Sequence, residues 1–258
     1  MTLQVLVATM DQSDHSLLDK MNINSDVIVG NQCSVDSVER FDYKGHSAVY
    51  LNFAERGVGL NRNNALMRAE ADVCIFADDD VVYYDGYSET VINAFHENPE
   101  ADVILFNIDE EDSKRYRIQK KHRVGRFNYL RYGTVRIAVR LKSIKENGIY
   151  FNQTFGGGTE HCHGEDNLFL NACLNKGLKI IALPISVLQL KNERMSSWNR
   201  GYDKKYLEDQ GHLYHALSPR FWRLLCLQDS FRRRHSYRDV ATVLEAYRIM
   251  VSSVRSGG

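Results

Sequence analysis

The chain has 258 residues, 43% of them hydrophobic, which is enough for one large α/β domain or one domain with a small appendage. Lysine plus arginine balance aspartate plus glutamate at 33 each, so the sequence does not favour a nucleic-acid-binding protein. The five cysteines are scattered without a CxxC pair, which indicates neither a disulfide framework nor a zinc ribbon.

Short apolar runs alternate with helical patterns through the first part of the chain. We expect strands at residues 3–8, 26–30, 48–53, 72–77 and 101–108, and helices at 13–21, 59–71 and 88–99. Because the strands are nearly continuous β-branched runs separated by helices, the sequence predicts an α/β fold with a mainly parallel, Rossmann-like sheet flanked by helices.

The second part begins with a basic, weakly periodic stretch at 112–132, which we interpret as an excursion from the sheet. After it we expect a strand at 134–140, a helix at 141–149, a glycine-rich segment at 155–166, a helix ending at Gly177, and the last strands at 178–190. The composition then becomes aromatic and basic. We therefore expect an α/β domain at 1–190 and a helical extension packed on it at 191–258.

The last helix of this extension is expected to have Val240, Val243, Leu244, Tyr247 and Met250 on one face. Such a face is compatible with core packing, a dimer contact or a membrane contact, so an oligomer stays open. The arginines at 220–238 and the basic stretch at 112–132 suit anionic lipid, although charge runs are common on solvated surfaces.

No targeting or membrane-spanning pattern is present in the sequence. The first residues, MTLQVLVATMDQSD, lack the basic start and long apolar core of a signal peptide. No apolar run approaches the roughly 20 residues that a spanning helix needs. We expect a cytoplasmic location, with contact at the inner face of the membrane as an open addition.

Three consecutive aspartates follow the strand at 72–77, in the stretch CIFADDDVVY. In an extended chain Asp78 and Asp80 point to one side and Asp79 to the other. Two carboxylates that converge repel each other unless a cation lies between them, and hard oxygen ligands favour Mg²⁺ or Mn²⁺. A solvated turn after a buried strand explains an isolated aspartate triplet equally well.

The surrounding residues resemble the central signature of family 2 glycosyltransferases with the GT-A fold. In RGVGLNRNNALMRAEADVCIFADDDVVY, the residues Gly57, Arg62, Asn63, Ala65 and Leu66 match the helix that precedes the family's Asp-x-Asp motif. The resemblance implies that Asp78 and Asp80 hold the metal and bind the diphosphate of a nucleotide-sugar, with Asp79 facing the donor sugar or supporting the strand end. It also implies that Arg62 reaches the nucleotide, whereas a surface helical arginine is the simpler alternative.

Two further segments resemble the family's donor-binding strands. The first, VLVATMDQSD, makes Ala8 and Thr9 candidates for contact with the nucleoside. The second, VIVGNQCSVDS, has Asn31 and Gln32 where the family usually has two aspartates. Because an amide both donates and accepts, Gln32 can pair with a uracil edge, which favours a UDP-sugar but leaves the base open.

A fourth segment, GGGTEHCHGEDNLFL, resembles the acceptor-side Gly-Glu-Asp motif of the family. The resemblance makes Asp166 the base that takes the proton of the acceptor hydroxyl, with Glu165 beside it shaping the acceptor site. Capping of the helix start is the alternative role for both residues. His161 and His163 are candidates for the acceptor side; a zinc site that includes them is a rival interpretation.

A tail at 193–217 resembles one found in bacterial members of the family, in which Trp198 and Tyr202 stack on sugars or pack the tail on the domain. The resemblance spans about residues 3–215 and implies an inverting, Mn²⁺- or Mg²⁺-dependent hexosyltransferase of polysaccharide biosynthesis. Its acceptor would be a saccharide or a lipid-linked saccharide. A nucleotidyltransferase and a non-catalytic nucleotide- or sugar-binding protein remain as alternatives.

Overall fold

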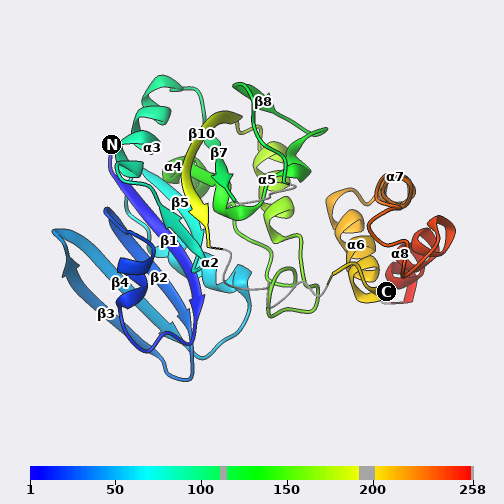
Figure 1. Cartoon of the computed structure of the whole chain (residues 1–258), viewed down its shortest axis with the longest axis horizontal. Coiled ribbons are helices and arrows are strands. Elements are labelled where there is room, and N and C mark those ends of the chain that lie inside the picture. The colour runs from blue at the N-terminus through cyan, green and yellow to red at the C-terminus, as the bar shows by residue number, and fades with distance from the viewer. Residues whose placement is uncertain (111–114, 192–200, 257–258) are drawn as a thin grey trace.

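The computed structural model describes residues 1–110, 115–191 and 201–256, and a ten-stranded sheet forms the centre of the fold (Figure 1). The strands are β1 (Leu3–Met10), β2 (Asp26–Gln32), β3 (Ser37–Tyr43), β4 (His46–Phe53), β5 (Val73–Asp78), β6 (Val81–Tyr83), β7 (Val103–Asp109), β8 (His122–Val124), β9 (Ile137–Arg140) and β10 (Ile180–Leu190). The helices are α1 (Ser16–Lys20), α2 (Val58–Arg68), α3 (Tyr87–Glu97), α4 (Leu141–Glu146), α5 (Glu165–Asn175), α6 (Lys204–Leu217), α7 (Trp222–Arg232) and α8 (Val243–Ser256), with short 3₁₀ turns at Tyr129–Arg131 and Thr134–Arg136.

The strand order is β3-β4-β2-β1-β5-β9-β7-β10-β6, and β8 pairs with β10 outside this path. The strands β4, β2, β1 and β5 form a continuous parallel block, and β7 pairs with β10 in parallel. Antiparallel pairing is confined to β3, β6, β8 and β9. The prediction of a mainly parallel sheet flanked by helices is therefore confirmed.

Helices cover both faces of the sheet, because alternate side chains of each strand point to opposite faces. Val5 and Val7 of β1 belong to the core on one face, which α1 and α3 cover, while Leu6 belongs to the core under α2, α4 and α5. Burial of both faces explains why the strands read as continuous apolar runs in the sequence.

Three strands were not expected from the sequence. The β3–β4 hairpin turns through Lys44 and Gly45, which both have positive φ angles, of 54° and 81°. This backbone matches the twist of the two strands, and glycine adopts it without strain. β3 is an edge strand whose side chains are mostly exposed, so it carries no apolar signal. β6 and β8 have only three residues each.

Two geometric expectations were wrong. β5 ends at Asp78, and Asp79 and Asp80 form a turn, so the extended geometry does not continue through the aspartate run. On the last helix, Leu244 is 56% exposed, and Val240 lies before the helix and is 48% exposed. Met250 of the expected face is buried, together with Ala246 outside it, because this side of α8 packs on α6 and α7.

The C-terminal helices α6, α7 and α8 pack on one another around a core of their own, and Figure 1 shows them beyond α5, at the end opposite β3 and β4. Gly211 of α6 makes this packing close: a Cβ atom there would lie 2.1 Å from the carbonyl oxygen of Met250. The division of the chain at residue 190 stays a prediction. Within the described residues, no helix is both long enough and apolar enough to span a membrane.

Candidate active site

The aspartate run lies where β5 ends, next to the end of β1 in the parallel block. Ligands of such sheets bind beyond the carboxyl ends of the strands. Asp79 accepts a hydrogen bond from the hydroxyl of Thr9, with Oγ1 and Oδ2 separated by 2.7 Å. Thr9 is thereby fixed to the aspartate turn, and Ala8 precedes it at 7% exposure.

Arg62 connects the aspartate run to the acidic start of α5. Its guanidinium lies 2.6 Å from Oδ1 of Asp78 and 2.8 Å from Oε1 of Glu165, and the residue is only 3% exposed. Burial alone would lower the pKa of Arg62, but the two carboxylates outweigh it and hold the pKa above its usual range. The arginine is therefore a buried cation between two motifs that are far apart in the sequence, and not a surface residue.

The carboxylate of Asp80 has one oxygen that no hydrogen bond satisfies. This oxygen, Oδ1, is buried and has no hydrogen-bond partner among the described residues. Burial, and then the negative charges of Asp78 and Asp79, raise the pKa of Asp80 to about 6. A divalent cation beside Asp78 and Asp80 would satisfy this oxygen and offset the repulsion, so the residues present fit an oxygen-ligated metal.

Asp166 lies in the first turn of α5, after Gly164, whose φ of 108° begins the helix. Its Oδ1 accepts a hydrogen bond from the backbone N–H of Asn167 at 2.7 Å. Burial, and then the neighbouring charge of Glu165, raise the pKa of Asp166 to about 7. A carboxyl in this range can take a proton near neutral pH, and the same carboxylate accepts a backbone N–H at the helix start, so the general base and the helix cap both stay predictions.

Gln32 lies at the end of β2 and is only 5% exposed. Its Oε1 accepts from the backbone N–H of Gly57 at 2.7 Å, at the start of α2. The neighbouring Asn31 donates to the carbonyl of Gln12 and to Asn52. These amides join loops at the sheet edge. Because Oε1 of Gln32 is already hydrogen-bonded, this side chain would use its Nε2 hydrogens to bind a nucleobase.

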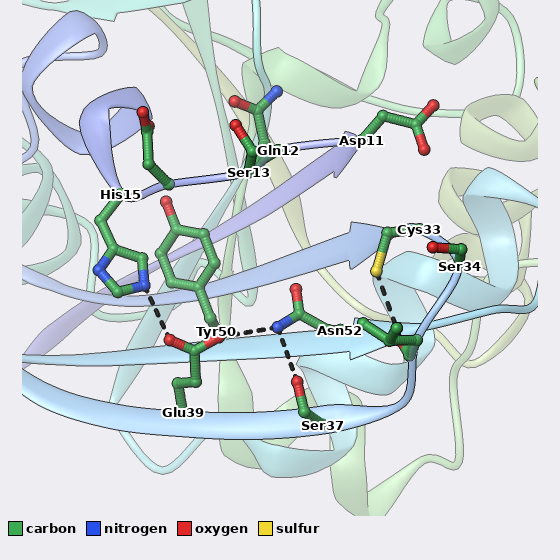
Figure 2. A pocket seen from close by; sticks show the side chains of 12 residues that line it. Asp11, Gln12, Ser13, His15, Cys33, Ser34, Ser37, Glu39, Tyr50 and Asn52 are labelled. Atoms are coloured by element: carbon green, nitrogen blue, oxygen red, sulfur yellow. Dashed lines mark hydrogen bonds and ion pairs between the residues drawn. The ribbon is translucent and has the colours of Figure 1, made fainter.

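A cavity of about 710 Å³ lies at the ends of β1 and β2 and beside the β3–β4 hairpin (Figure 2). Its lining residues are Asp11, Gln12, Ser13, Asp14, His15, Cys33, Ser34, Val35, Ser37, Glu39, Tyr50 and Asn52. The amide of Gln12 donates to Oγ1 of Thr9 at 3.0 Å, and Thr9 donates to Asp79. This pair of hydrogen bonds links the cavity to the aspartate run.

His161 and His163 contact α6, where each has a hydrogen-bond partner. Nδ1 of His161 lies 3.0 Å from Oδ1 of the fully buried Asp209, and Nε2 of His163 lies 2.9 Å from Oε1 of Gln210. The ring of His163 stacks on Tyr206 at 4.5 Å between centroids. Both histidines therefore fix the glycine-rich segment to the C-terminal helices.

The zinc interpretation has one related cluster among the described residues: Cys162, His163 and Asp209 have ligand atoms within 4.8 Å of one another. Burial and the Asp209 carboxylate raise the pKa of the Cys162 thiol to about 12. The carboxylate of Asp209 already accepts hydrogen bonds from His161, the backbone of Cys162 and Lys205. The cluster is satisfied by hydrogen bonds without an ion. Trp198 lies outside the described residues.

Two structural residues of the site were missed. Nδ2 of Asn61 donates to the carbonyl of Gly30 at 2.8 Å, and a Cβ at Gly30 would lie 1.9 Å from Oδ1 of Asn61. Asn61 thus ties α2 to β2 beside Arg62. The second missed residue is Asp209. The sequence has one signal for each of the two: Asn61 lies next to the Arg-Asn motif, and Asp209 begins the Asp-x-Gly of the tail.

A parallel sheet with carboxylates at its edge, joined through a buried arginine to an acidic helix start, has the architecture of a GT-A glycosyltransferase. The sequence model of Glycosyl transferase family 2 matches residues 8–178. The chain belongs to glycosyl transferase family 2, and its class of activity is the transfer of a sugar from a nucleotide-sugar. No curated protein has significant sequence similarity to the chain.

Solved structures of TarS from S. aureus share the fold. TarS 1-349 is 17% identical with a TM-score of 0.58, and its complex with UDP-GlcNAc is 15% identical with a TM-score of 0.61; each match covers 100% of this chain and 92% of the other. A longer TarS structure is 16% identical with a TM-score of 0.61, and the match covers 98% of this chain and 55% of that one. The predicted GT-A fold and glycosyltransferase class are confirmed; the roles of single residues stay predictions.

Proposed function

We propose that the chain transfers a sugar from a UDP-sugar to a hydroxyl of a saccharide or lipid-linked saccharide, with inversion at the anomeric carbon, in polysaccharide synthesis. The observation that carries this proposal is the double ion pair of Arg62 with Asp78 and Glu165. It connects the strand-end aspartates to the helix start that carries Asp166.

The nucleoside would occupy the cavity beyond β1 and β2. Its volume of about 710 Å³ is in the range of small-molecule sites. Ala8 and Thr9 would border the nucleoside, and Gln32 would donate from Nε2 to a carbonyl of the base. The UDP-GlcNAc complex of TarS, which has the same fold, supports UDP as the nucleotide.

The diphosphate would lie at the aspartate run, where Asp78 and Asp80 would hold Mn²⁺ or Mg²⁺. The bound cation would neutralise the charge that develops on the leaving diphosphate. The buried, unpartnered Oδ1 of Asp80 supports this assignment. Asp79, held by Thr9, would face the donor sugar at the end of the strand.

Asp166 would take the proton of the acceptor hydroxyl as its oxygen attacks the anomeric carbon. The bond from that carbon to the diphosphate oxygen breaks at the same time, so the leaving group is UDP. The pKa of about 7 for Asp166 supports this role at neutral pH. Glu165, held by Arg62, would border the acceptor, and His161 and His163 would lie on the acceptor side through the α6 contact.

The test is a transfer assay with UDP-sugars and a panel of saccharide acceptors, in which nucleotide products are separated. We expect release of UDP that depends on Mn²⁺ or Mg²⁺ and on an acceptor. Release of pyrophosphate from a nucleoside triphosphate and a sugar phosphate would instead identify a nucleotidyltransferase. Tight donor binding without any turnover would identify a non-catalytic binding protein.

A further inference from the structure

The outward face of α7 carries large apolar side chains. Phe221 is 53% exposed, Leu224 63%, Leu227 42% and Phe231 55%. Phe221 precedes the helix directly, and the spacings of three, three and four residues put all four on one stripe. We call these four residues and the exposed arginines Arg220, Arg223, Arg232 and Arg234 the α7 surface.

The packing of the helix does not account for this stripe. The opposite side of α7 already fills the core of the C-terminal helices with Trp222 and Cys226, which are 8% and 0% exposed. A helix on the surface of a globular protein normally needs one apolar stripe. α7 has two, and the second faces solvent. Large exposed apolar patches mark sites of interaction.

The arginines flank the apolar stripe. At about 100° per residue, Arg223 and Arg232 fall on opposite sides of the line through Leu224 and Phe231. Within the described part of the chain, none of the four arginines of the α7 surface forms an ion pair with a carboxylate. The acidic residue of the helix, Asp229, is buried and forms its ion pair with Arg233, so the four arginines have no direct carboxylate contact and can meet an anionic partner.

We propose that the α7 surface lies in the plane of an anionic lipid membrane. The phenylalanine and leucine side chains would enter the boundary between headgroups and acyl chains, and the arginines would meet the lipid phosphates. A second copy bound to the same surface about a two-fold axis would bring two sets of arginines together, which is unfavourable. The charge of the α7 surface therefore favours lipid. This inference goes beyond the proposed function and does not depend on it.

Co-sedimentation of the full chain with vesicles tests the proposal. We expect binding to vesicles of equimolar phosphatidylcholine and phosphatidylglycerol, none to phosphatidylcholine alone, and weaker binding at high salt. Arg223→Gln with Arg232→Gln should weaken binding about 25-fold, since each arginine near an anionic surface contributes about fivefold. Leu224→Ser with Phe231→Ser should reduce binding to the background level.

The matched control is Met67→Ser with Arg68→Gln, an exposed apolar and basic pair on α2, where Met67 is 51% exposed. It should bind vesicles like the unchanged chain. Absence of vesicle binding, equal binding to both lipid compositions, or binding that the α7 variants leave intact would each overturn the proposal. Self-association without vesicles that Leu224→Ser and Phe231→Ser abolish, in a chain that does not bind lipid, would assign the surface to a second copy instead.

Discussion

Replacement of Asp166 by asparagine should abolish sugar transfer and, at the same time, stabilise the fold. The pKa of the Asp166 carboxyl is raised from 3.8 to about 7, mainly by burial and then by the charge of Glu165. A carboxyl whose pKa is raised in the folded state favours folding only while it is protonated. Its charge therefore opposes folding as the pH rises from about 4 through about 7.

The structure gives the size of this effect. A rise of about 3 pKa units corresponds to about 4 kcal/mol at a pH above both values, which is the upper limit for the gain on removing the charge. Asparagine keeps the shape and an oxygen that can accept from the backbone of Asn167. We expect a net gain of about 1–3 kcal/mol at pH 8 and almost none near pH 3, where the carboxyl is mostly protonated in both the folded and the unfolded state.

The assay is urea unfolding of Asp166→Asn and the unchanged chain at both pH values, alongside initial rates of transfer. The control is Asp239→Asn, whose side chain is 91% exposed and which should change the free energy of unfolding by less than about 0.5 kcal/mol. In the unchanged chain, kcat/KM should fall as the pH drops below about 7, because the base is then protonated.

Two results would refute this reasoning. Equal or lower stability of Asp166→Asn at pH 8 would mean that the charge is not opposed by its surroundings. Transfer that persists in Asp166→Asn would remove Asp166 as the base, whatever its effect on stability.

Two further predictions concern buried contacts. Arg62→Gln leaves Asp78 and Glu165 without their shared cation and should lower the free energy of unfolding by about 3–5 kcal/mol; an unchanged urea midpoint would contradict the buried bridge. Gly211→Ala puts a Cβ 2.1 Å from the carbonyl oxygen of Met250 and should destabilise the chain by about 1–3 kcal/mol. A melting temperature equal to that of the unchanged chain would mean that the C-terminal helices can separate without loss.

Much of the sheet could be predicted because its strands are buried on both faces. β1 and β5 are mostly apolar and almost entirely buried, so their runs stand out in the sequence. β3 could not be predicted in the same way, since it is an exposed edge strand whose pairing depends on the turn at Lys44 and Gly45. Which residues of the α8 face are buried could not be predicted, because burial there depends on contact with α6, which no local pattern encodes.

The motifs of the site could be located in the sequence, but their contacts could not. Arg62 and Glu165 are 103 residues apart, and nothing in either motif indicates that they form an ion pair. The sequence left an extended strand end and a turn at Asp79 and Asp80 equally open, because an aspartate run has no preference that separates the two. His161 was expected on the acceptor side, with a zinc site as the rival interpretation, and neither expectation indicates that its partner is Asp209 of α6.

The central claim is that the aspartate run and the cavity beside it bind a nucleotide-sugar together with a divalent cation. The most direct measurement is calorimetric titration of the chain with UDP and with UDP-sugars, in the presence of Mn²⁺ and after its removal by a chelator. We expect binding that needs Mn²⁺ and that Asp80→Asn weakens at least tenfold, about 1.4 kcal/mol. Binding of UDP that is equally tight without the cation and in Asp80→Asn, or no binding at all, would contradict the account.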